Sequence, residues 1–239
     1  MPETDEFRPE NRIGAVLVSS RSLDEYRRMF ALTGADLAGR VLDCPGGAAS
    51  LTAELTAAGG HALACDPVYE RPVGQVREAA LESLGRGYAY HQAHPDEYVW
   101  TYFRDPDHYL ESRTRSAELF AADRAARPEN YVHAELPALP FADRQFDLVL
   151  SSHLLFSYAD RFDREFHVAS LRELARVGRE VRVFPLVSMG LAENPELAPV
   201  RAELAAAGLH TAIRPVDYEF QRGGDAMMTI SRAGHDSAE

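Results

Sequence analysis

The chain has 239 residues, 46% of them hydrophobic, which predicts one globular domain with a substantial core. Its net charge is −12 and all 25 of its basic residues are arginine, which excludes lysine Schiff-base chemistry and the lysine of a P-loop. Phosphate contacts supply much of the affinity for nucleic acid, so an acidic chain without basic runs is not expected to bind it.

No segment approaches 18 uninterrupted apolar residues, and the first twelve residues lack the basic and apolar regions of a signal peptide. The two cysteines, Cys44 and Cys65, form no CxxC pair, which disfavours a structural zinc site. We therefore expect a cytoplasmic protein without membrane contact and without a bound metal. The sequence indicates no oligomeric state.

Strands and helices are expected to alternate along the first 66 residues. A helix is predicted over 23–34 with Gly34 as its end, followed by a strand over 40–44. A helix over 50–58 and a strand over 61–66 come next, with Gly59 and Gly60 between them. The alternation then stops for more than 60 residues, which a plain crossover does not need.

Residues 67–130 are expected to form a helical insertion within a single domain that covers 1–239. Helical pieces at 74–87 and 108–126 flank a segment rich in aromatic residues and histidines, 88–109. Aromatic walls with one or two arginines suit a planar or anionic small molecule. The insertion is therefore predicted to form a lid over the pocket of a small-molecule substrate.

The alternation resumes with strands at 131–136, 146–152 and 179–187, and with helices at 162–178 and 194–209. The segments 210–220 and 225–232 flank QRGG and predict an antiparallel hairpin. Together these elements predict a doubly wound, Rossmann-like α/β fold. Its sheet is mostly parallel, with a C-terminal antiparallel hairpin.

Three acids follow successive predicted strands, where ligands of such sheets bind. Asp43 precedes the loop CPGG, Asp66 ends the next strand, and Glu135 follows the third. The GxGxxG pattern fails at Cys44, and a carboxylate at Asp43 would repel a pyrophosphate. Acids in these places suit a ligand with a sulfonium or ammonium group, a ribose and an adenine but no phosphate, and S-adenosylmethionine fits that description.

Four stretches resemble successive motifs of the class I S-adenosylmethionine-dependent methyltransferases that act on small molecules: VLDCPGGAASLTAEL, ALACDP, AELPALPFADRQFDLVLSSHLLF and LRELARVGREVRVFPL. The resemblance covers about 40–66 and 131–232 and leaves 67–130 unexplained. Two departures stand out. Cys44 or Pro45 replaces the usual first loop glycine, and Glu135 replaces the usual aspartate before LPF.

The resemblance implies roles for residues at the matching positions. Asp66 would hold the ribose hydroxyls and Pro67 would stack on the adenine edge, while Glu135 and Leu136 would recognise the adenine amine and its flanking face. The loop along the methionine part would comprise Asp43, Cys44, Pro45, Gly46 and Gly47. Ser151, Ser152 and His153 would line the crevice next to the sulfonium, Tyr26 would cover the methionine end, and Arg21 or Arg27 would pair with its carboxylate.

His153 is the candidate catalytic base, which is needed only if the nucleophile must lose a proton. Each motif also has a structural alternative: the glycine pair as a plain turn, Asp66 as a helix cap, and His153 as a histidine hydrogen-bonded to the backbone. Two other functions compete with methyl transfer: a protein that binds the cofactor as a sensor or scaffold, and an NAD-dependent oxidoreductase.

Overall fold

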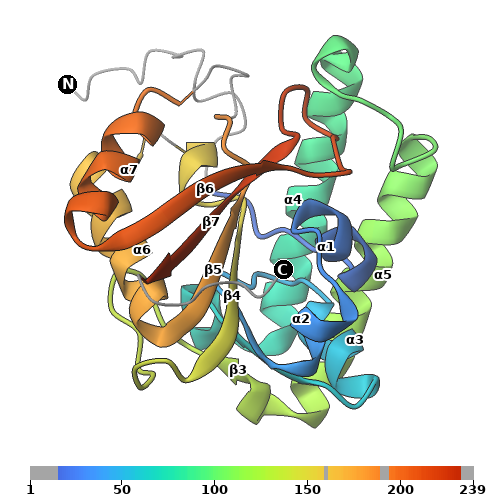
Figure 1. Ribbon diagram of the computed structural model, residues 1–239. Coiled ribbons are helices and arrows are strands. Elements are labelled where there is room, and N and C mark those ends of the chain that lie inside the picture. The colour runs from blue at the N-terminus through green and yellow to red at the C-terminus, as the bar shows by residue number, and fades with distance from the viewer. Residues whose placement is uncertain (1–15, 159–160, 189–193, 233–239) are drawn as a thin grey trace, which may run out of the picture.

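A computed structural model describes residues 16–158, 161–188 and 194–232. Seven strands form one sheet in the order β3-β2-β1-β4-β5-β7-β6 (Figure 1). Strands β1 to β5 are parallel, and β7 runs antiparallel to both β5 and β6. The predicted Rossmann-like sheet with its C-terminal antiparallel pair is therefore confirmed. The strands are β1 Arg40–Asp43, β2 His61–Cys65, β3 Tyr131–Val132, β4 Phe146–Ser152, β5 Gly178–Phe184, β6 Leu209–Pro215 and β7 Ala226–Arg232.

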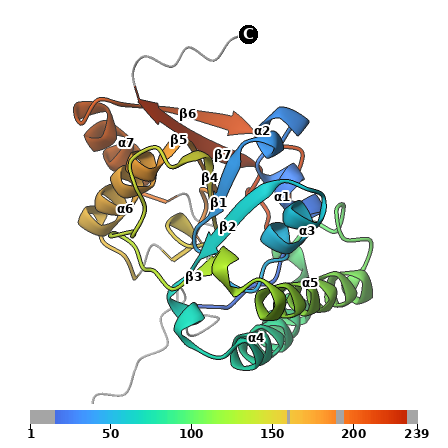
Figure 2. The ribbon, with the colours of Figure 1, turned by 90° about the horizontal axis from the view of Figure 1, so that it is seen from below.

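Helices cover both faces of this sheet, so the fold has three layers (Figure 2). Helices α6 and α7 lie on one face, and the remaining helices lie on the other. Among the described residues, no helix is long and apolar enough to cross a bilayer. The α-helices are α1 Leu23–Met29, α2 Gly34–Ala38, α3 Leu51–Ala57, α4 Val73–Ala93, α5 Pro106–Ala126, α6 Arg164–Val177 and α7 Leu197–Ala206.

The prediction that Gly34 ends a helix is wrong, because Gly34 is the first residue of α2. The side chain of Thr33 accepts a hydrogen bond from the Asp36 amide, and the Asp36 carboxylate accepts one from the Thr33 amide. This reciprocal pair is a capping box, which starts a helix at this position. The preceding helix, α1, has already ended at Met29.

The insertion forms two long helices that pack against each other and belong to the layer on the α3 face of the sheet. Helix α4 continues to Ala93, six residues beyond the predicted end. Phe120 of α5 stacks on Tyr69 at 5.9 Å between ring centroids and meets Tyr131 of β3 edge-on at 5.4 Å. Tyr131 therefore anchors α5 to the edge of the sheet.

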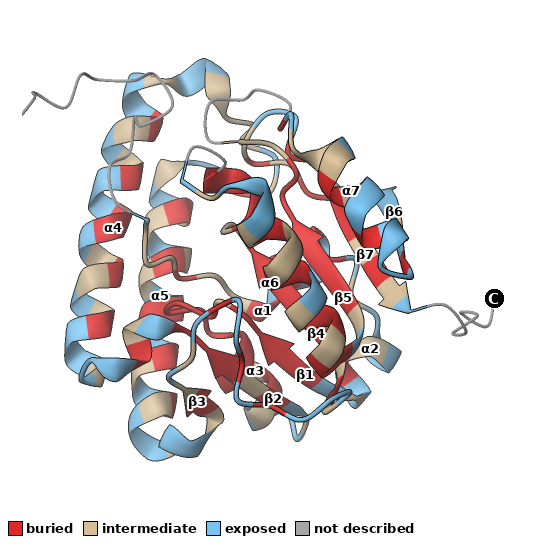
Figure 3. Ribbon diagram, turned by 90° about the vertical axis from the view of Figure 1, so that its left-hand side faces the viewer, coloured by how far each residue is buried: buried red, intermediate tan, exposed pale blue. Residues whose placement is uncertain are grey.

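Burial follows the order of the strands. The central strands β1, β4 and β5 are buried along most of their length, whereas the edge strand β6 is largely exposed (Figure 3). The buried apolar stretch Leu148–Leu150 of β4 is expected for a strand that is covered on both faces. The carboxyl ends of these parallel strands converge on one edge of the sheet, and the candidate site lies there.

Candidate active site

A cavity of about 300 Å³ lies at the carboxyl ends of β1, β2 and β4. It combines the loop after β1, the start of the segment after β2, the segment after β3 and the residues after β4. The N-terminal segment before α1 closes it from the other side. Its lining residues are Val16–Ser19, Cys44, Pro45, Gly47, Cys65, Asp66–Val68, Ala134–Leu136, Ser152–Leu154, Phe162 and Phe166.

The loop after β1 needs both of its glycines because other backbone and side chains pass close to it. Gly47 has φ +52°, and a Cβ there would lie 2.8 Å from the carbonyl oxygen of Ser19. A Cβ on Gly46 would lie 2.8 Å from that of Ala64 in β2. The Ser19 carbonyl also accepts a hydrogen bond from the Ala48 amide at 2.9 Å. The glycines therefore let the N-terminal segment lie directly on the loop.

Asp66 ties two walls of the cavity together. One carboxylate oxygen accepts from the Gly47 amide at 2.8 Å and the other accepts from the Val68 amide at 2.9 Å. The second bond caps a short 3₁₀ helix, Pro67–Glu70. Asp66 therefore acts as a helix cap, which is the alternative role considered for it. Burial raises the pKa of Asp66, and these two amides oppose that rise. Each carboxylate oxygen keeps a lone pair for a further donor.

The far wall combines an acid with apolar surface. The carboxylate of Glu135 is exposed at the rim and makes no hydrogen bond or ion pair with the described residues, whereas Leu136 beside it is buried. Phe162 and Phe166 stack on each other with ring centroids 4.5 Å apart. A flat ring with an exocyclic donor would find both apolar contact and an acceptor here.

Four of the predicted cofactor residues do not line this cavity: Tyr26, Asp43, Gly46 and Ser151. Asp43 is fully buried, and the Tyr26 hydroxyl donates to its two carboxylate oxygens at 2.9 and 3.1 Å. Burial raises the pKa of Asp43 to about 8 although the Tyr26 hydrogen bond opposes this. Ser151 is buried and its hydroxyl has no partner among the described residues.

His153 follows β4 directly in a left-handed conformation, with φ +51°. Its amide donates to the Phe184 carbonyl at 2.7 Å, and its Nδ1 lies 2.8 Å from the Ser152 hydroxyl. Burial lowers the pKa of the imidazole, and the positive charges of Arg21 and Arg113 lower it further. His153 is therefore neutral at physiological pH. The alternative role for His153 is a ring hydrogen-bonded to the backbone. Its Nδ1 instead meets the side chain of Ser152.

A second, smaller cavity of about 100 Å³ adjoins the first and shares Leu17, Val18, Ser19 and His153 with it. Helices α4 and α5 supply one wall, as the insertion hypothesis expects. The β6–β7 connection supplies Tyr218, Phe220 and Gln221, which the sequence analysis did not single out. Its remaining lining residues are Ser20, Arg21, Ala80, Ser83, Leu84, Gly87, His91, Tyr98, Tyr109 and Arg113.

A buried ion pair stands at the base of this second cavity. Arg113 of α5 donates to both carboxylate oxygens of Glu25 in α1, each at 2.6 Å. The Tyr218 hydroxyl donates to the same carboxylate at 2.7 Å, and the Arg21 Nε lies 3.5 Å from it. Glu25 thus joins α1, α5 and the β6–β7 connection.

His91 lies inside an aromatic cluster at the other end of the second cavity. Its ring centroid is 4.1 Å from that of Tyr98, 4.9 Å from Tyr109 and 5.0 Å from Phe220. Burial, assisted by Arg113, lowers the pKa of His91 to about 3. Its Nδ1 is buried and has no hydrogen-bond partner among the described residues.

The two cysteines are neighbours, and both line the first cavity. Asp43 pairs with Ala64 in the parallel register, which places Cys44 beside Cys65. Both thiols are free and buried.

One comparison matches a known family over part of the chain. The family model described as "Methyltransferase domain" matches residues 105–180, from α5 to the first part of β5. This match covers less than half of the chain, and it supports the resemblance to the class I S-adenosylmethionine-dependent methyltransferases. The first cavity suits S-adenosylmethionine because Gly47 admits close backbone approach and two acids lie beside apolar walls.

Proteins similar to this chain include an uncharacterized protein of Methanocaldococcus jannaschii, which is 26% identical over 217 residues, 89% of this chain and 94% of that protein. A solved structure of the mitomycin 7-O-methyltransferase MmcR is 21% identical, with 88% of this chain covered and a TM-score of 0.46. Magnesium protoporphyrin IX methyltransferase from Synechocystis PCC 6803 is 16% identical, with 88% and 78% of the two chains covered and a TM-score of 0.46. The chain spans about half (54%) of MmcR, and these similarities identify no substrate.

Proposed function

We propose that this protein is a methyltransferase and transfers a methyl group from S-adenosylmethionine to an O, N or S atom of a small planar molecule in the second cavity. The observation that supports this proposal is the wall that the two cavities share. A cofactor whose nucleoside occupies the first cavity would direct its methionine end toward Ser19 and His153. The acceptor would then meet the methyl group from the second cavity.

Cofactor binding is assigned from the lining of the first cavity. Asp66 would accept from the ribose hydroxyls, and Glu135 from the adenine amine, with Pro67 and Leu136 against the base. Ser152 and the loop residues Cys44, Pro45 and Gly47 would contact the methionine part.

The carboxylate of the cofactor would pair with Arg21. This arginine lines the second cavity next to the shared wall, whereas Arg27 is exposed on α1 and lines neither cavity. Tyr26 and Asp43 would support the loop from behind and make no contact with the cofactor.

The cofactor, when bound, supplies a methyl group on a sulfonium, which is already activated for displacement. The chain would contribute alignment of the acceptor and exclusion of water, which account for much of the acceleration in such reactions. His153 would take the proton when the nucleophile is a hydroxyl or an amine. Its neutral imidazole at the shared wall supports this role.

The acceptor is expected to be flat because aromatic rings dominate the wall opposite His153. The Phe220 ring lies 5.1 Å from that of Tyr98 and is stacked on that of Tyr109 at 5.3 Å, measured between ring centroids. Gln221 offers polar contacts. The insertion would thus serve as the fixed outer wall of the acceptor pocket, in the place where the sequence predicts a lid.

Calorimetry with S-adenosylhomocysteine tests the cofactor assignment, with Asp66→Ala expected to weaken binding by roughly 1–3 kcal/mol. Incubation with S-adenosylmethionine and a panel of aromatic hydroxyl, amine and thiol compounds, read by mass spectrometry, tests the transfer. His153→Asn should lower the rate on a hydroxyl acceptor about 10²-fold or more. His94→Asn, which changes a histidine outside both cavities, should not.

Different failures would contradict different parts of the proposal. Absence of binding to S-adenosylhomocysteine, with binding to NADH instead, would exclude the cofactor site. Tight binding without methylation of any acceptor would favour a sensor or scaffold.

A further inference from the structure

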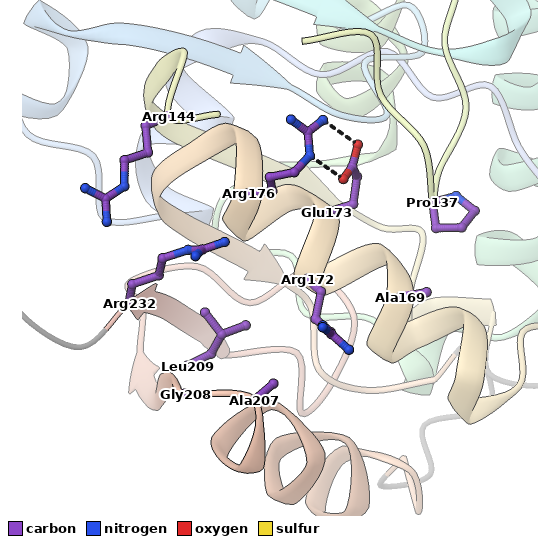
Figure 4. Close-up of a pocket in the computed structure, with 10 residues that line it drawn as sticks. All are labelled: Pro137, Arg144, Ala169, Arg172, Glu173, Arg176, Ala207, Gly208, Leu209 and Arg232. Carbon is purple, nitrogen blue, oxygen red and sulfur yellow. Dashed lines mark hydrogen bonds and ion pairs between the residues drawn. The ribbon is translucent and has the colours of Figure 1, made fainter. Parts of the chain in front are cut away.

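A third cavity, of about 720 Å³, lies at the opposite end of the sheet from the cofactor cavity, where β4 and β5 begin and β7 ends (Figure 4). Helix α6, the turn between α7 and β6, and the segments before β4 and at the end of β7 surround it. The lining residues are Pro137, Arg144, Ala169, Arg172, Glu173, Arg176, Ala207, Gly208, Leu209 and Arg232.

The charge of this cavity contrasts with that of the whole chain. Four of the ten lining residues are arginines and one is an acid, Glu173, which gives the lining a net charge of +3. The whole chain carries −12. The cavity therefore concentrates positive charge on a molecule that otherwise repels anions.

Arg176 is occupied by the protein itself. Its guanidinium donates to both carboxylate oxygens of Glu173 at 2.8 Å, to Asp143 and to the carbonyls of Leu139 and Phe141 (Figure 4). These bonds fasten the loop before β4 onto α6. The Arg176 carbonyl also accepts from the Arg144 amide at 2.8 Å, so Arg176 holds Arg144 in place. Glu173, the one acid of the lining, is neutralised by the same contacts.

The other three arginines retain unused donors. The side chains of Arg144 and Arg172 are exposed and have no hydrogen bond or ion pair with any described residue. Arg232 makes one long hydrogen bond, 3.4 Å, from its Nε to the Ala175 carbonyl. Three guanidinium groups from three different elements thus line one cavity, and the nearby carboxylates of Glu173 and Asp143 are both bound to Arg176.

We propose that this cavity binds the oligophosphate group of a small molecule, an activity beyond the proposed methyl transfer. Planar guanidinium forks match phosphate oxygens bidentately, and several around one cavity suit a group with several negative charges. None of the lining residues is aromatic, so the site would recognise the phosphates and not a nucleobase. Its position makes it independent of the cofactor cavity.

The test is calorimetry of the full chain with sodium tripolyphosphate at low and moderate salt. Arg144→Gln/Arg172→Gln should weaken binding at least 10-fold, and higher salt should weaken it further. The control Arg115→Gln/Arg214→Gln removes the same charge from exposed positions outside the cavity and should change affinity less than 2-fold. S-adenosylhomocysteine affinity, measured on every variant, reports that each one is folded.

Three results would overturn the proposal. The first is absence of tripolyphosphate binding. The second is equal weakening of tripolyphosphate binding in both double variants, which would show that the anion responds to the overall charge of the protein and not to this cavity. The third is binding of a hexaglutamate peptide without binding of tripolyphosphate, which would make the cavity a docking site for an acidic protein segment.

Discussion

The hydroxyl of Tyr26 donates to both carboxylate oxygens of Asp43, at 2.9 and 3.1 Å. This contact joins the N-terminal helix to the tip of the central strand β1 and seals the acid from the cofactor cavity. Asp43 therefore supports the loop from behind and does not face a ligand in the cavity, where the sequence analysis expected its charge to act. We expect Asp43 to affect the molecule mainly through the pH at which its carboxyl group loses a proton.

Asp43 is expected to make stability depend on pH. Burial raises its pKa from 3.8 to about 8 in the folded chain. Between these values the folded state holds a proton that the unfolded state has lost, so stability falls as pH rises, by up to about 1.4 kcal/mol per pH unit. Asp43→Asn should lack this slope. Urea unfolding of both proteins from pH 5 to 9 measures it, and parallel curves would contradict the assignment.

Gly47 is expected to be intolerant of a side chain for two separable reasons. Gly47→Ala would strain a left-handed residue, at about 1–2 kcal/mol, and would push its Cβ against the Ser19 carbonyl. Gly59→Ala is the matched control, because Gly59 has φ +84° but open space around it. Both should lower stability in urea, whereas only Gly47→Ala should weaken S-adenosylhomocysteine binding in calorimetry. Equal cofactor affinity in the two variants would exclude Gly47 from the site.

The central sheet and the acids beside it could be predicted from the sequence because their signals are local. The segment 146–152 carries the apolar residues Phe146 and Leu148–Leu150 and becomes β4 with the same bounds. Asp66 and Glu135 follow buried strands, and the topology of a parallel sheet brings such positions to one edge, where both line the cavity. Local patterns can also mislead. Gly34 suggests the end of a helix, but the capping box of Thr33 and Asp36 starts one there.

The acceptor side could not be predicted because long-range packing builds it. The sequence places Phe220 at the end of a hairpin strand, yet it lies on the connection after β6, and its ring stacks on Tyr109 of α5, more than a hundred residues away. Glu25 looks like a solvated helix residue, and only the tertiary fold brings Arg113 and Tyr218 to it. Neither contact can be predicted from the pattern of neighbouring residues in the sequence.

Cys44 is expected to resist alkylation in the folded protein. Its hydrogen bond with Cys65 and its burial raise the pKa of the thiol, and the thiolate is the reactive form. Iodoacetamide at pH 8 should modify the native chain ~100-fold more slowly than the chain in guanidinium chloride, and S-adenosylhomocysteine should slow it further because both thiols line its cavity. Intact mass over time measures this, and rapid native modification would be incompatible with the buried pair.

The ion pair between Arg113 and Glu25 should matter far more than a surface pair of the same chemistry. Arg113→Met leaves the fully buried Glu25 carboxylate without its bidentate partner, at about 3–5 kcal/mol. Arg77→Met breaks the pair with Glu118, in which both side chains are exposed, and should lower stability far less than Arg113→Met does.

The double variant Glu25→Gln/Arg113→Met separates lost attraction from uncompensated charge. It removes the stranded carboxylate, so it should regain part of the stability that Arg113→Met loses. Urea unfolding of the four proteins gives the comparison. If Arg113→Met and Arg77→Met cost the same, the buried pair would not hold α1 against α5, and the base of the acceptor cavity would have to be fixed by its aromatic contacts instead.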